Sequence, residues 1–312
     1  APAATLYEIV RKLPEGAKVE LDHAGGDAAL KLRAGRFNTD LSVLPVEDFP
    51  SMTEGKLPHG FGLPAGQLRE LADRTRFAIS TEETRYYLNG IYLHATESDG
   101  VRVLRAVATD GHRLAFSSAT LDTDVPNKQE VILPRKTVIE LQRLLSDASV
   151  PEGQDAPMIE MQFAPNQAKF SFGAMEFVTK LVEGKFPDYN RVIPKNHKNS
   201  VTLGRAPLLA SLQRTAILTS EKFKGVRLNF EPGTLRVASN NAEQEEAVDE
   251  LDIDYGGDAI EIGFNVTYLI DALANMSQQE MIKIELQDAN SSALVTLPDD
   301  TNFKYVVMPM RI

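Results

Sequence analysis

Two kinds of helix-and-strand segment recur in a fixed order along the chain, and this repeat constrains the fold more than any other feature. The first kind opens with apolar residues at the i, i+3, i+4, i+7 spacing of one helix face, at residues 6–13, 138–145 and 266–273. An alternating apolar and polar run that predicts a strand follows each helix, at residues 17–21, 158–163 and 281–286. Matching points of the repeat are roughly 130 residues apart.

The second kind of segment occurs twice, with a helical stripe at residues 68–75 and again at residues 209–216. Apolar phrases that predict strands follow the two stripes, at residues 77–81, 90–93, 215–219 and 225–228. One pair of similar segments could arise in any α+β protein. Five segments in a consistent order favour true tandem copies, and their order leads us to expect that the chain begins in the middle of a repeat.

These segments predict an α+β fold of two or three domains, in which helices pack on antiparallel sheets. Strands that alternate apolar with polar residues suit antiparallel sheets with one buried and one solvated face. Asp110-Gly111, between apolar runs at residues 104–108 and 114–116, predicts a two-residue hairpin turn. The two helices of a copy should pack on the same sheet face, which leaves their polar faces outward together.

No residue pattern in the chain indicates catalysis, a metal site or a cofactor. There is no Cys, the five His are scattered, and the sequence contains no phosphate-binding loop, nucleophile elbow or zinc motif. No apolar run approaches the roughly 18 residues of a membrane-spanning helix. We therefore expect a soluble, cytoplasmic protein that is not an enzyme and that uses neither a cofactor nor a membrane.

The charges of the chain give conflicting indications about nucleic acid. There are 33 Lys and Arg against 44 Asp and Glu, a formal net charge of −11, whereas attraction of a whole surface to phosphates needs the opposite sign. Cations nevertheless lie opposite or beside the apolar stripes of four predicted helices, at Arg11, Arg69, Arg76, Lys136, Arg143 and Arg214. Helices placed side by side would turn them into a basic strip for a phosphate backbone. The alternative is an ordinary charged outer face, which acidic residues such as Glu140 share.

Several short motifs run in order along the whole chain. The most specific are residues 85–90, RYYLNG, and residues 108–115, ATDGHRLA. Further motifs lie at residues 134–136, 186–189, 192–196, 223–228, 263–266 and 305–312. With them the sequence closely resembles the bacterial DNA polymerase III beta subunits, the sliding clamps. It departs from that family at Thr39, Asn290 and Ile312, where a large aromatic residue, an apolar residue and Leu, respectively, are common.

The resemblance implies three copies of one domain with two helices on antiparallel sheets, and two subunits that close head to tail into a ring around duplex DNA. We expect residues 1–62 to be the C-terminal half of the first clamp domain, without its other half, and residues 63–191 and 192–312 to be the second and third domains. Enclosure would retain DNA without strong phosphate contacts, which reconciles DNA binding with an acidic surface.

The function implied by the resemblance is that of a processivity factor. Its expected partners are duplex DNA without sequence preference, the replicative polymerase catalytic subunit, the clamp loader, other proteins with a clamp-binding motif, and a second copy of the chain. No cofactor is implied. The alternative is a peptide-binding scaffold that does not encircle DNA, which the acidic charge would permit.

The helix faces and the resemblance together predict three sets of site residues. Those expected to face DNA are Arg69, Arg76, Arg85, Tyr86, Tyr87, Arg135, Lys136, Arg143 and Arg214. Those expected at the contact between subunits are Leu41, Ile217 and Leu218. A groove between the second and third domains would receive a short peptide built around Gln and apolar residues, and is expected to include Leu88, Thr109, Gly111, His112, Arg113, Leu114, Pro194, Phe223, Asn265, Tyr268, Val306, Met308, Pro309, Met310 and Arg311.

Overall fold

All strand pairs in the described part of the chain are antiparallel, as the alternating residue pattern predicts. The computed structural model describes residues 1–26, 28–49, 57, 59–122, 129–146 and 157–312, and the chain divides into two compact units, Ala1–Glu54 and Gly55–Ile312. The first unit contains helix α1 (Ala3–Val10), a sheet of β1 (Glu20–Asp22), β2 (Leu30–Ala34) and β3 (Phe37–Leu41), and the short 3-10 helix η1 (Val46–Asp48).

The second unit carries the remaining elements of the described chain. Its α-helices are α2 (Ala65–Asp73), α3 (Arg135–Leu145), α4 (Arg205–Ala216) and α5 (Val266–Asn275). Its 3-10 helices are η2 (Arg76–Ala78), η3 (Glu83–Leu88) and η4 (Tyr189–Arg191). Its strands are β4 (His59–Pro64), β5 (Gly90–Ser98), β6 (Val101–Thr109), β7 (Arg113–Thr120), β8 (Glu130–Pro134), β9 (Met158–Ala164), β10 (Gln167–Phe172), β11 (Met175–Lys180), β12 (Asn199–Gly204), β13 (Gly225–Glu231), β14 (Thr234–Asn240), β15 (Glu246–Asp252), β16 (Ile260–Asn265), β17 (Met281–Leu286), β18 (Ala293–Leu297) and β19 (Asp300–Val307).

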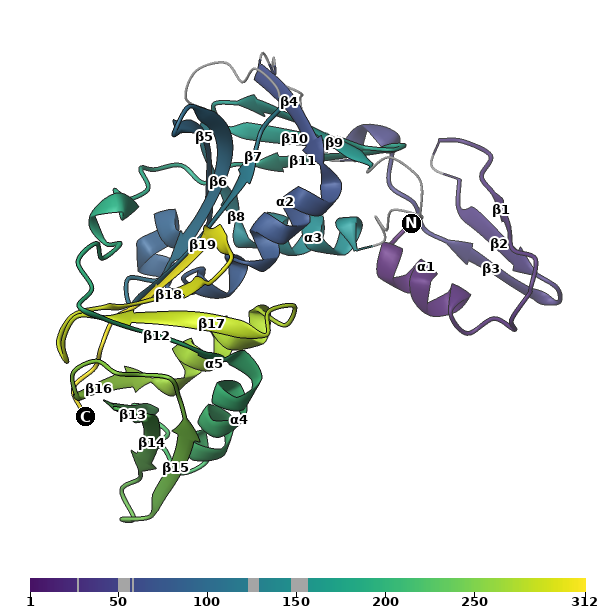
Figure 1. Cartoon of the computed structure of the whole chain (residues 1–312). Coiled ribbons are helices and arrows are strands. Elements are labelled where there is room, and N and C mark those ends of the chain that lie inside the picture. The colour runs from purple at the N-terminus through teal and green to yellow at the C-terminus, as the bar shows by residue number, and fades with distance from the viewer. Residues whose placement is uncertain (27, 50–56, 58, 123–128, 147–156) are drawn as a thin grey trace. The chain divides into compact units, whose positions relative to one another are not determined.

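A continuous eight-stranded sheet joins two copies of the repeat within the second unit (Figure 1). Its order is β12-β17-β18-β19-β7-β6-β5-β8, and its central seam is the pairing of β19 with β7 from Phe303↔Ser117 to Val307↔Arg113. Two four-stranded sheets flank it, in the orders β11-β10-β9-β4 and β15-β14-β13-β16. Residues that are far apart in the sequence therefore meet along the seam, which becomes the framework of the candidate site.

The helices of the second unit lie in two pairs, α2 beside α3 and α4 beside α5, on the inner side of its curve with the strands outside (Figure 1). The stripe of α3 is buried as predicted, at Val138, Leu141 and Leu145. In α4 the buried face is Leu208, Ser211, Leu212 and Thr215, which is rotated from the predicted stripe of Leu209, Leu212 and Ala216. The rotation follows from packing on β14, where the Ser239 hydroxyl donates to Thr215 O at 2.6 Å. The predicted α+β class, with helix pairs on antiparallel sheets, is confirmed.

The strands predicted at residues 77–81 and 215–219 are wrong, in the same way in both copies. A buried Thr closes the helix instead: Thr75 donates its hydroxyl to Leu71 O at 2.7 Å, and Thr215 donates to Ser211 O at 3.0 Å. The chain then continues as a tight turn, in which Ala78 N bonds Thr75 O and Leu218 N bonds Thr215 O. Because both segments have the same turn, they are equivalent parts of the repeat.

Two other expectations differ from the structure in extent. The strand predicted at residues 17–21 covers only Glu20–Asp22, because its partner β2 ends at Ala34 and the next residue, Gly35, turns with φ of +61°. The hairpin at Asp110-Gly111 is present but longer than two residues, since Thr109 pairs with Leu114 and four residues lie between them. The longer loop carries several of the predicted site residues.

An aromatic cluster on the eight-stranded sheet encloses His94. The ring of Tyr92 stacks on His94 and on Phe186, with centroids 4.8 Å apart in each case. His94 Nε2 lies 3.0 Å from the Tyr189 hydroxyl. Burial, together with the nearby Arg105 cation, lowers the pKa of His94 to about 4 against the opposing influence of Glu130. The folded protein therefore keeps this His neutral in weakly acidic solution.

Protonation of His94 is expected to make stability depend on pH in the window between about 4 and 6.5. There the unfolded chain, with an ordinary His pKa, binds a proton that the folded chain does not, so stability falls as pH falls through this window. With allowance for solvent screening, the loss amounts to about 2 kcal/mol. Urea unfolding of the wild type and His94→Gln at pH 4.5 and 7 should show the wild type losing more stability. Equal losses in the two proteins would contradict the assignment.

Candidate functional site

The hairpin loop at residues 110–113 is built by one carboxylate and one glycine. The Asp110 Oδ1 atom accepts hydrogen bonds from the backbone N of His112 at 2.9 Å and of Arg113 at 3.1 Å. Gly111 has a φ of +91°, which favours glycine. A Cβ on Gly111 would lie 2.6 Å from an Arg85 guanidinium nitrogen, so η3 is close to the loop. The loop is thereby held with the His112 ring exposed.

Arg113 connects this hairpin loop to α5 of the next copy. Its Nε donates to Asp110 Oδ2 at 3.0 Å, and an Nη donates to Asp271 Oδ2 at 2.7 Å. Its guanidinium also lies over the Tyr268 ring, 4.6 Å from the centroid. Only 10 % of the Arg113 side chain is exposed. The cation is thus enclosed by two carboxylates and an aromatic face, at the seam between copies.

The C-terminal tail lies beside the hairpin loop and β16. Met308 N donates to His112 O at 3.0 Å, and Met310 N donates to Gly263 O at 2.8 Å. A Cβ on Gly263 would come within 2.5 Å of Met310 O and 2.8 Å of the Ile312 side chain. The tail can therefore lie against β16 because glycine has no side chain at this position. Met308 itself is 45 % exposed. The tail therefore presents thioether and proline surface next to the hairpin.

The predicted groove residues divide into a buried floor and an exposed rim. Leu88, Leu114 and Val306 are buried together in a small core on the outer side of the sheet seam, and they form the floor.

The other predicted groove residues are less buried or lie at the rim. Phe223 is 57 % exposed, and its loop reaches the start of α5 through Val266 N, which donates to Lys224 O at 2.8 Å. The Thr109 hydroxyl donates a hydrogen bond to Arg113 O. The side chains of Pro194 and Pro309 are half-buried, whereas that of Arg311 is exposed. The Asn265 side chain caps α5 by accepting from Thr267 N at 2.9 Å, so its amide oxygen is already engaged.

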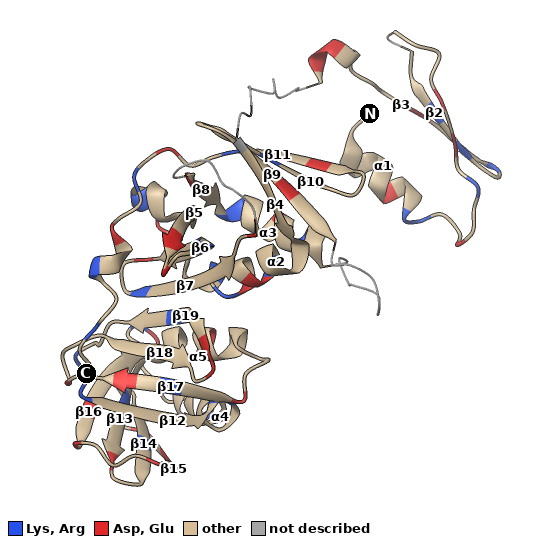
Figure 2. Ribbon diagram, turned by 45° about the horizontal axis from the view of Figure 1, so that its top comes forward, with Lys and Arg blue, Asp and Glu red and all other residues tan. Residues whose placement is uncertain are grey.

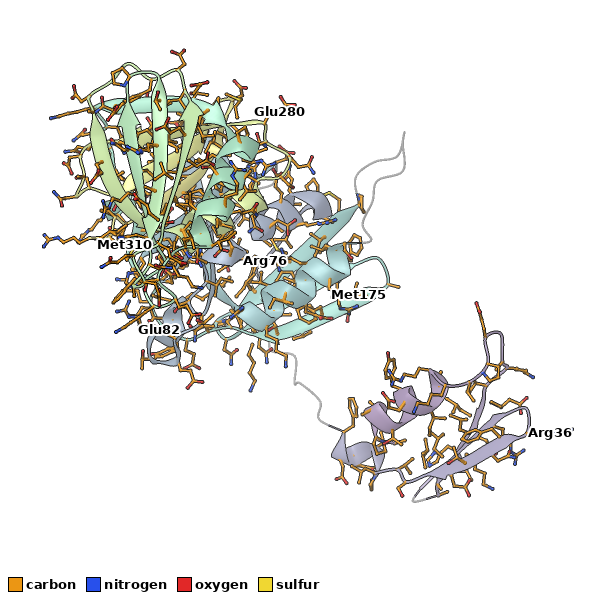
Figure 3. The ribbon with its side chains drawn as sticks, turned by 90° about the horizontal axis from the view of Figure 1, so that it is seen from below. Arg36, Arg76, Glu82, Met175, Glu280 and Met310 are labelled. Atoms are coloured by element: carbon orange, nitrogen blue, oxygen red, sulfur yellow. The ribbon has the colours of Figure 1, made fainter. Side chains whose placement is uncertain are left out.

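A pocket of about 570 Å³ brings together residues that were predicted to belong to different sites. Its wall includes Arg76 and Arg135, which were predicted to face DNA, and His112, Arg113 and Tyr268, which were predicted to contact a peptide. Arg76 lies among the helices of the second unit, whereas Glu82 and Met310 lie toward one edge of it in this view (Figure 3). The pocket also includes Phe77 and Asp271, which sequence reasoning missed. No local signal could have found them, because their neighbours in the pocket come from distant parts of the chain.

The cations predicted to face DNA differ in how much of their charge is engaged. Arg69 pairs with Asp73 at 3.6 Å, Arg85 with Glu82 at 3.8 Å, Arg143 with Glu140 at 2.6 Å and Arg214 with Asp249 at 3.1 Å from Nε. The bonds from Arg143 and Arg214 lower the pKa of Glu140 and Asp249 respectively. Within the described ranges, Arg76, Arg135 and Lys136 are exposed and make no ion pair. These three side chains are therefore the ones open to a phosphate.

Acidic and basic residues are interspersed over the ribbon of the second unit rather than gathered on one face (Figure 2). Tyr86 is 56 % exposed and meets Tyr87 edge to face, with centroids 5.8 Å apart.

The residues predicted at the contact between subunits differ in exposure. Ile217, just after α4, is 78 % exposed and Leu218 is half-buried, while Leu41 at the end of β3 is only 8 % exposed within the first unit. Large apolar side chains that are exposed next to one another are typical of a contact surface. Ile217 has the exposure expected of such a side chain.

Neither a metal site nor a membrane span is found in the part of the chain that the structure describes. No group of three or more His, Asp or Glu residues there is arranged to hold a metal ion. None of the helices in those residues is long and apolar enough to cross a membrane.

Comparison with known proteins gives matches along the whole chain. Residues 62–188 match the family described as the central domain of the DNA polymerase III beta subunit, and residues 190–311 match its C-terminal domain. The beta sliding clamp of Caulobacter vibrioides is 42 % identical over 312 residues, which are 100 % of this chain and 82 % of that protein. The beta sliding clamp of Pseudomonas putida is also 42 % identical, over 100 % of this chain and 81 % of its own length.

Solved structures show the same similarity. The crystal structure of the DNA polymerase III subunit beta from Pseudomonas aeruginosa superimposes with a TM-score of 0.90 at 40 % identity, over 100 % of this chain and 82 % of that one. A second crystal structure from the same organism, of a sliding clamp bound to griselimycin, has a TM-score of 0.90 at 40 % identity and covers 100 % and 80 % of the two chains.

Proposed function

Because this chain belongs to the DNA polymerase III beta subunit family, the beta sliding clamps, we propose that it acts as a ring subunit that encircles duplex DNA and tethers DNA-handling proteins. The observation that supports this function best is that α2, α3, α4 and α5 lie in two pairs on the inner side of the second unit, with its three sheets outside them. Tandem copies that curve in this way present their helices to a common space. We propose residues 63–191 and 192–312 as the second and third domains, and no catalytic activity.

Enclosure explains why the chain can be acidic and still act on DNA. A ring retains DNA through its closed contacts, so phosphate affinity can stay low and sliding is not hindered. The formal net charge of −11 and the carboxylates that engage Arg143 and Arg214 fit weak contact with the backbone. We propose that Arg76, Arg135 and Lys136 make most of the remaining DNA contacts.

The ring is proposed to close head to tail between two copies of the chain. Within the second unit, β19 is the last strand of a three-strand series after α5, and it pairs with β7 of the neighbouring copy. The strand that ends the equivalent series after α1 is β3, and the strand equivalent to β7 is β15. Both β3 and β15 are outermost in their sheets among the described strands. Repetition of the same pairing would join β3 of one subunit to β15 of the other, with Leu41, Ile217 and Leu218 nearby.

The second proposed activity is capture of a short peptide by the groove at the seam. The buried Leu88, Leu114 and Val306 supply an apolar floor, and Met308 with Met310 supplies an adaptable rim. The polymerase catalytic subunit, the clamp loader and other proteins that carry a Gln-containing apolar motif are the proposed partners. Because the Pseudomonas aeruginosa clamp has been crystallised with griselimycin, we propose that this chain binds griselimycin too.

The test of encirclement compares circular with linear DNA. The chain is loaded on a nicked circular plasmid with a clamp loader and ATP, and protein that elutes with the plasmid from a large-pore column in moderate salt is measured. A ring should remain on the circle and be lost once a restriction enzyme cuts it. A scaffold that does not encircle DNA would show the same retention before and after cutting, with a steep salt dependence.

Lys136 and Arg143 provide a matched test of the DNA-facing strip, because they lie seven residues apart on α3 but only Arg143 is engaged by Glu140. Lys136→Ala is expected to weaken binding of a short linear duplex about fivefold near 0.15 M salt and to lower the salt slope by about one. Arg143→Ala should have a smaller effect, since its contact with a phosphate competes with Glu140. Fluorescence anisotropy at several salt concentrations measures both. Equal effects would show that ion pairing does not set the DNA contacts.

A further inference from the structure

We infer that Asp271 is a positioning residue for the peptide groove. Acting through Arg113, it fixes α5 against the hairpin loop and thereby determines how far apart the Tyr268 and His112 rings lie in the wall of the groove. This inference rests on the proposed peptide-binding function. Asp271 was not among the residues expected in the groove. In the structure it accepts a hydrogen bond from Arg113 at 2.7 Å, across the seam between two copies.

Arg113 depends on both carboxylates that it contacts, Asp110 and Asp271. With 10 % of its side chain exposed, the cation has lost most of its hydration, and such a charge is tolerated only when it is paired and hydrogen-bonded. Asp110 lies on the same hairpin loop as Arg113, whereas Asp271 comes from α5, 158 residues along the chain. Removing the Asp271 charge leaves Asp110, on its own loop, as the carboxylate that pairs with Arg113, while the contact with α5 is reduced to the Tyr268 ring.

Asp271 and Tyr268 belong to the same short helix, so a contact made by one fixes the position of the other. They are three residues apart on α5, so they occupy neighbouring positions on one helix face. The Tyr268 ring lies under the Arg113 guanidinium and stacks on His112 at 6.3 Å between centroids and 17° between planes. The bond from Arg113 to Asp271 therefore draws α5 toward the same loop that the rings bridge. Without it, the distance between the two rings is free to increase.

A second ion pair, Arg74 with Asp300, also crosses the seam but does not connect α5 to the hairpin loop. Arg74, just after α2, donates to Asp300 of β19 at 2.7 Å, and its guanidinium lies over the Phe303 ring. The exposed fractions of this pair, 17 % for Arg74 and 26 % for Asp300, are similar to those of Arg113 and Asp271, 10 % and 35 %. Both pairs cross between the same two copies, but Arg74 and Asp300 are not among the proposed groove residues. Asp300→Asn is therefore a matched control for Asp271→Asn.

The experiment measures three properties of the full chain: its affinity for the peptide, its thermal stability, and the environment of the His112 imidazole. The probe is a fluorescein-labelled synthetic pentapeptide of Gln and Leu, and binding is followed by anisotropy. Asp271→Asn is expected to lower affinity about tenfold and Asp300→Asn to leave it within twofold, while both lower Tm by similar small amounts. NMR of the His112 ring, one of five His in the chain, should show a shift of its resonance in Asp271→Asn only. Asp271→Glu, which keeps the charge, should restore most of the affinity.

Three results would separate the possible failures. If the wild type does not bind the peptide, the proposed function fails. If the wild type binds and Asp271→Asn binds equally well, with an unmoved His112 resonance, the proposed function stands and the positioning role is overturned. If both Asn variants lose affinity in proportion to their loss of Tm, Asp271 acts only through general stability, which also overturns the inference.

Discussion

Deletion of residues 308–312 is expected to abolish peptide binding, with at least a 100-fold loss of affinity, while the chain stays folded. The deleted tail supplies Met308, which is 45 % exposed, and the half-buried Pro309 and Met310. These residues form one rim of the proposed groove, and they are held there by Met308 N on His112 O and by Met310 N on Gly263 O. Apolar anchors of this kind carry most of the affinity of small interfaces. The labelled pentapeptide and anisotropy measure the loss.

Folding should survive the deletion because the tail lies outside the core. Strand β19 ends at Val307, before the deletion, and none of the five deleted residues is buried. Thermal unfolding should therefore show a small decrease of Tm, since the interactions lost among the described residues are two backbone hydrogen bonds and the packing of Ile312 beside Gly225 and Gly263. Met281→Ala is the control, because Met281 is similarly exposed, at 43 %, on β17. Unchanged peptide affinity in the deletion variant would remove the tail from the groove.

Helices and strands with long, regular periodicity were predictable from the sequence. The strand predicted at residues 281–286 corresponds residue for residue to β17, and the apolar stripe of α3 is buried as expected. Both predictions succeed because a regular apolar period places the apolar side chains on one face of the element, and that face is the one that becomes buried. Residues 77–81 and 215–219 were misread as strands. They are rich in apolar and β-branched residues, and the factor that decides against a strand is a buried Thr hydroxyl that bonds the preceding helical turn.

The candidate site was predictable only where neighbours in sequence are also neighbours in space. The hairpin loop that carries His112 and Arg113 follows from Asp110-Gly111, although its length does not, because Asp110 bonds two backbone N–H groups further along. The partnership of Arg113 with Asp271 depends on the seam between β19 and β7, which no local pattern encodes. The same holds for the cations: Glu140 is three residues from Arg143 and could be foreseen as its partner, whereas Asp249 is 35 residues from Arg214.

Replacement of Ile217 by Lys is expected to open the proposed ring and to abolish retention on circular DNA. The side chain is 78 % exposed in the single chain, so almost all of its apolar surface remains to be buried at a contact. Burying an Ile contributes about 2 kcal/mol, and a head-to-tail ring of two subunits has this contact twice, so separation of the subunits becomes easier by about 4 kcal/mol, roughly a thousandfold. Light scattering after size-exclusion chromatography should show monomer in place of dimer at micromolar concentration.

Loss of retention in Ile217→Lys has to come from ring opening and not from a damaged DNA or peptide surface. Val101→Lys provides the comparison, because Val101 is 46 % exposed at the start of β6 and is not among the proposed contact residues. Both variants should bind the labelled pentapeptide with wild-type affinity, since neither residue belongs to the proposed groove. Only Ile217→Lys should leave the nicked plasmid without a cut in the DNA. A variant that stays dimeric and remains on the circle would show that Ile217 does not close the ring, and the proposed pairing of β3 with β15 would lose its apolar anchor.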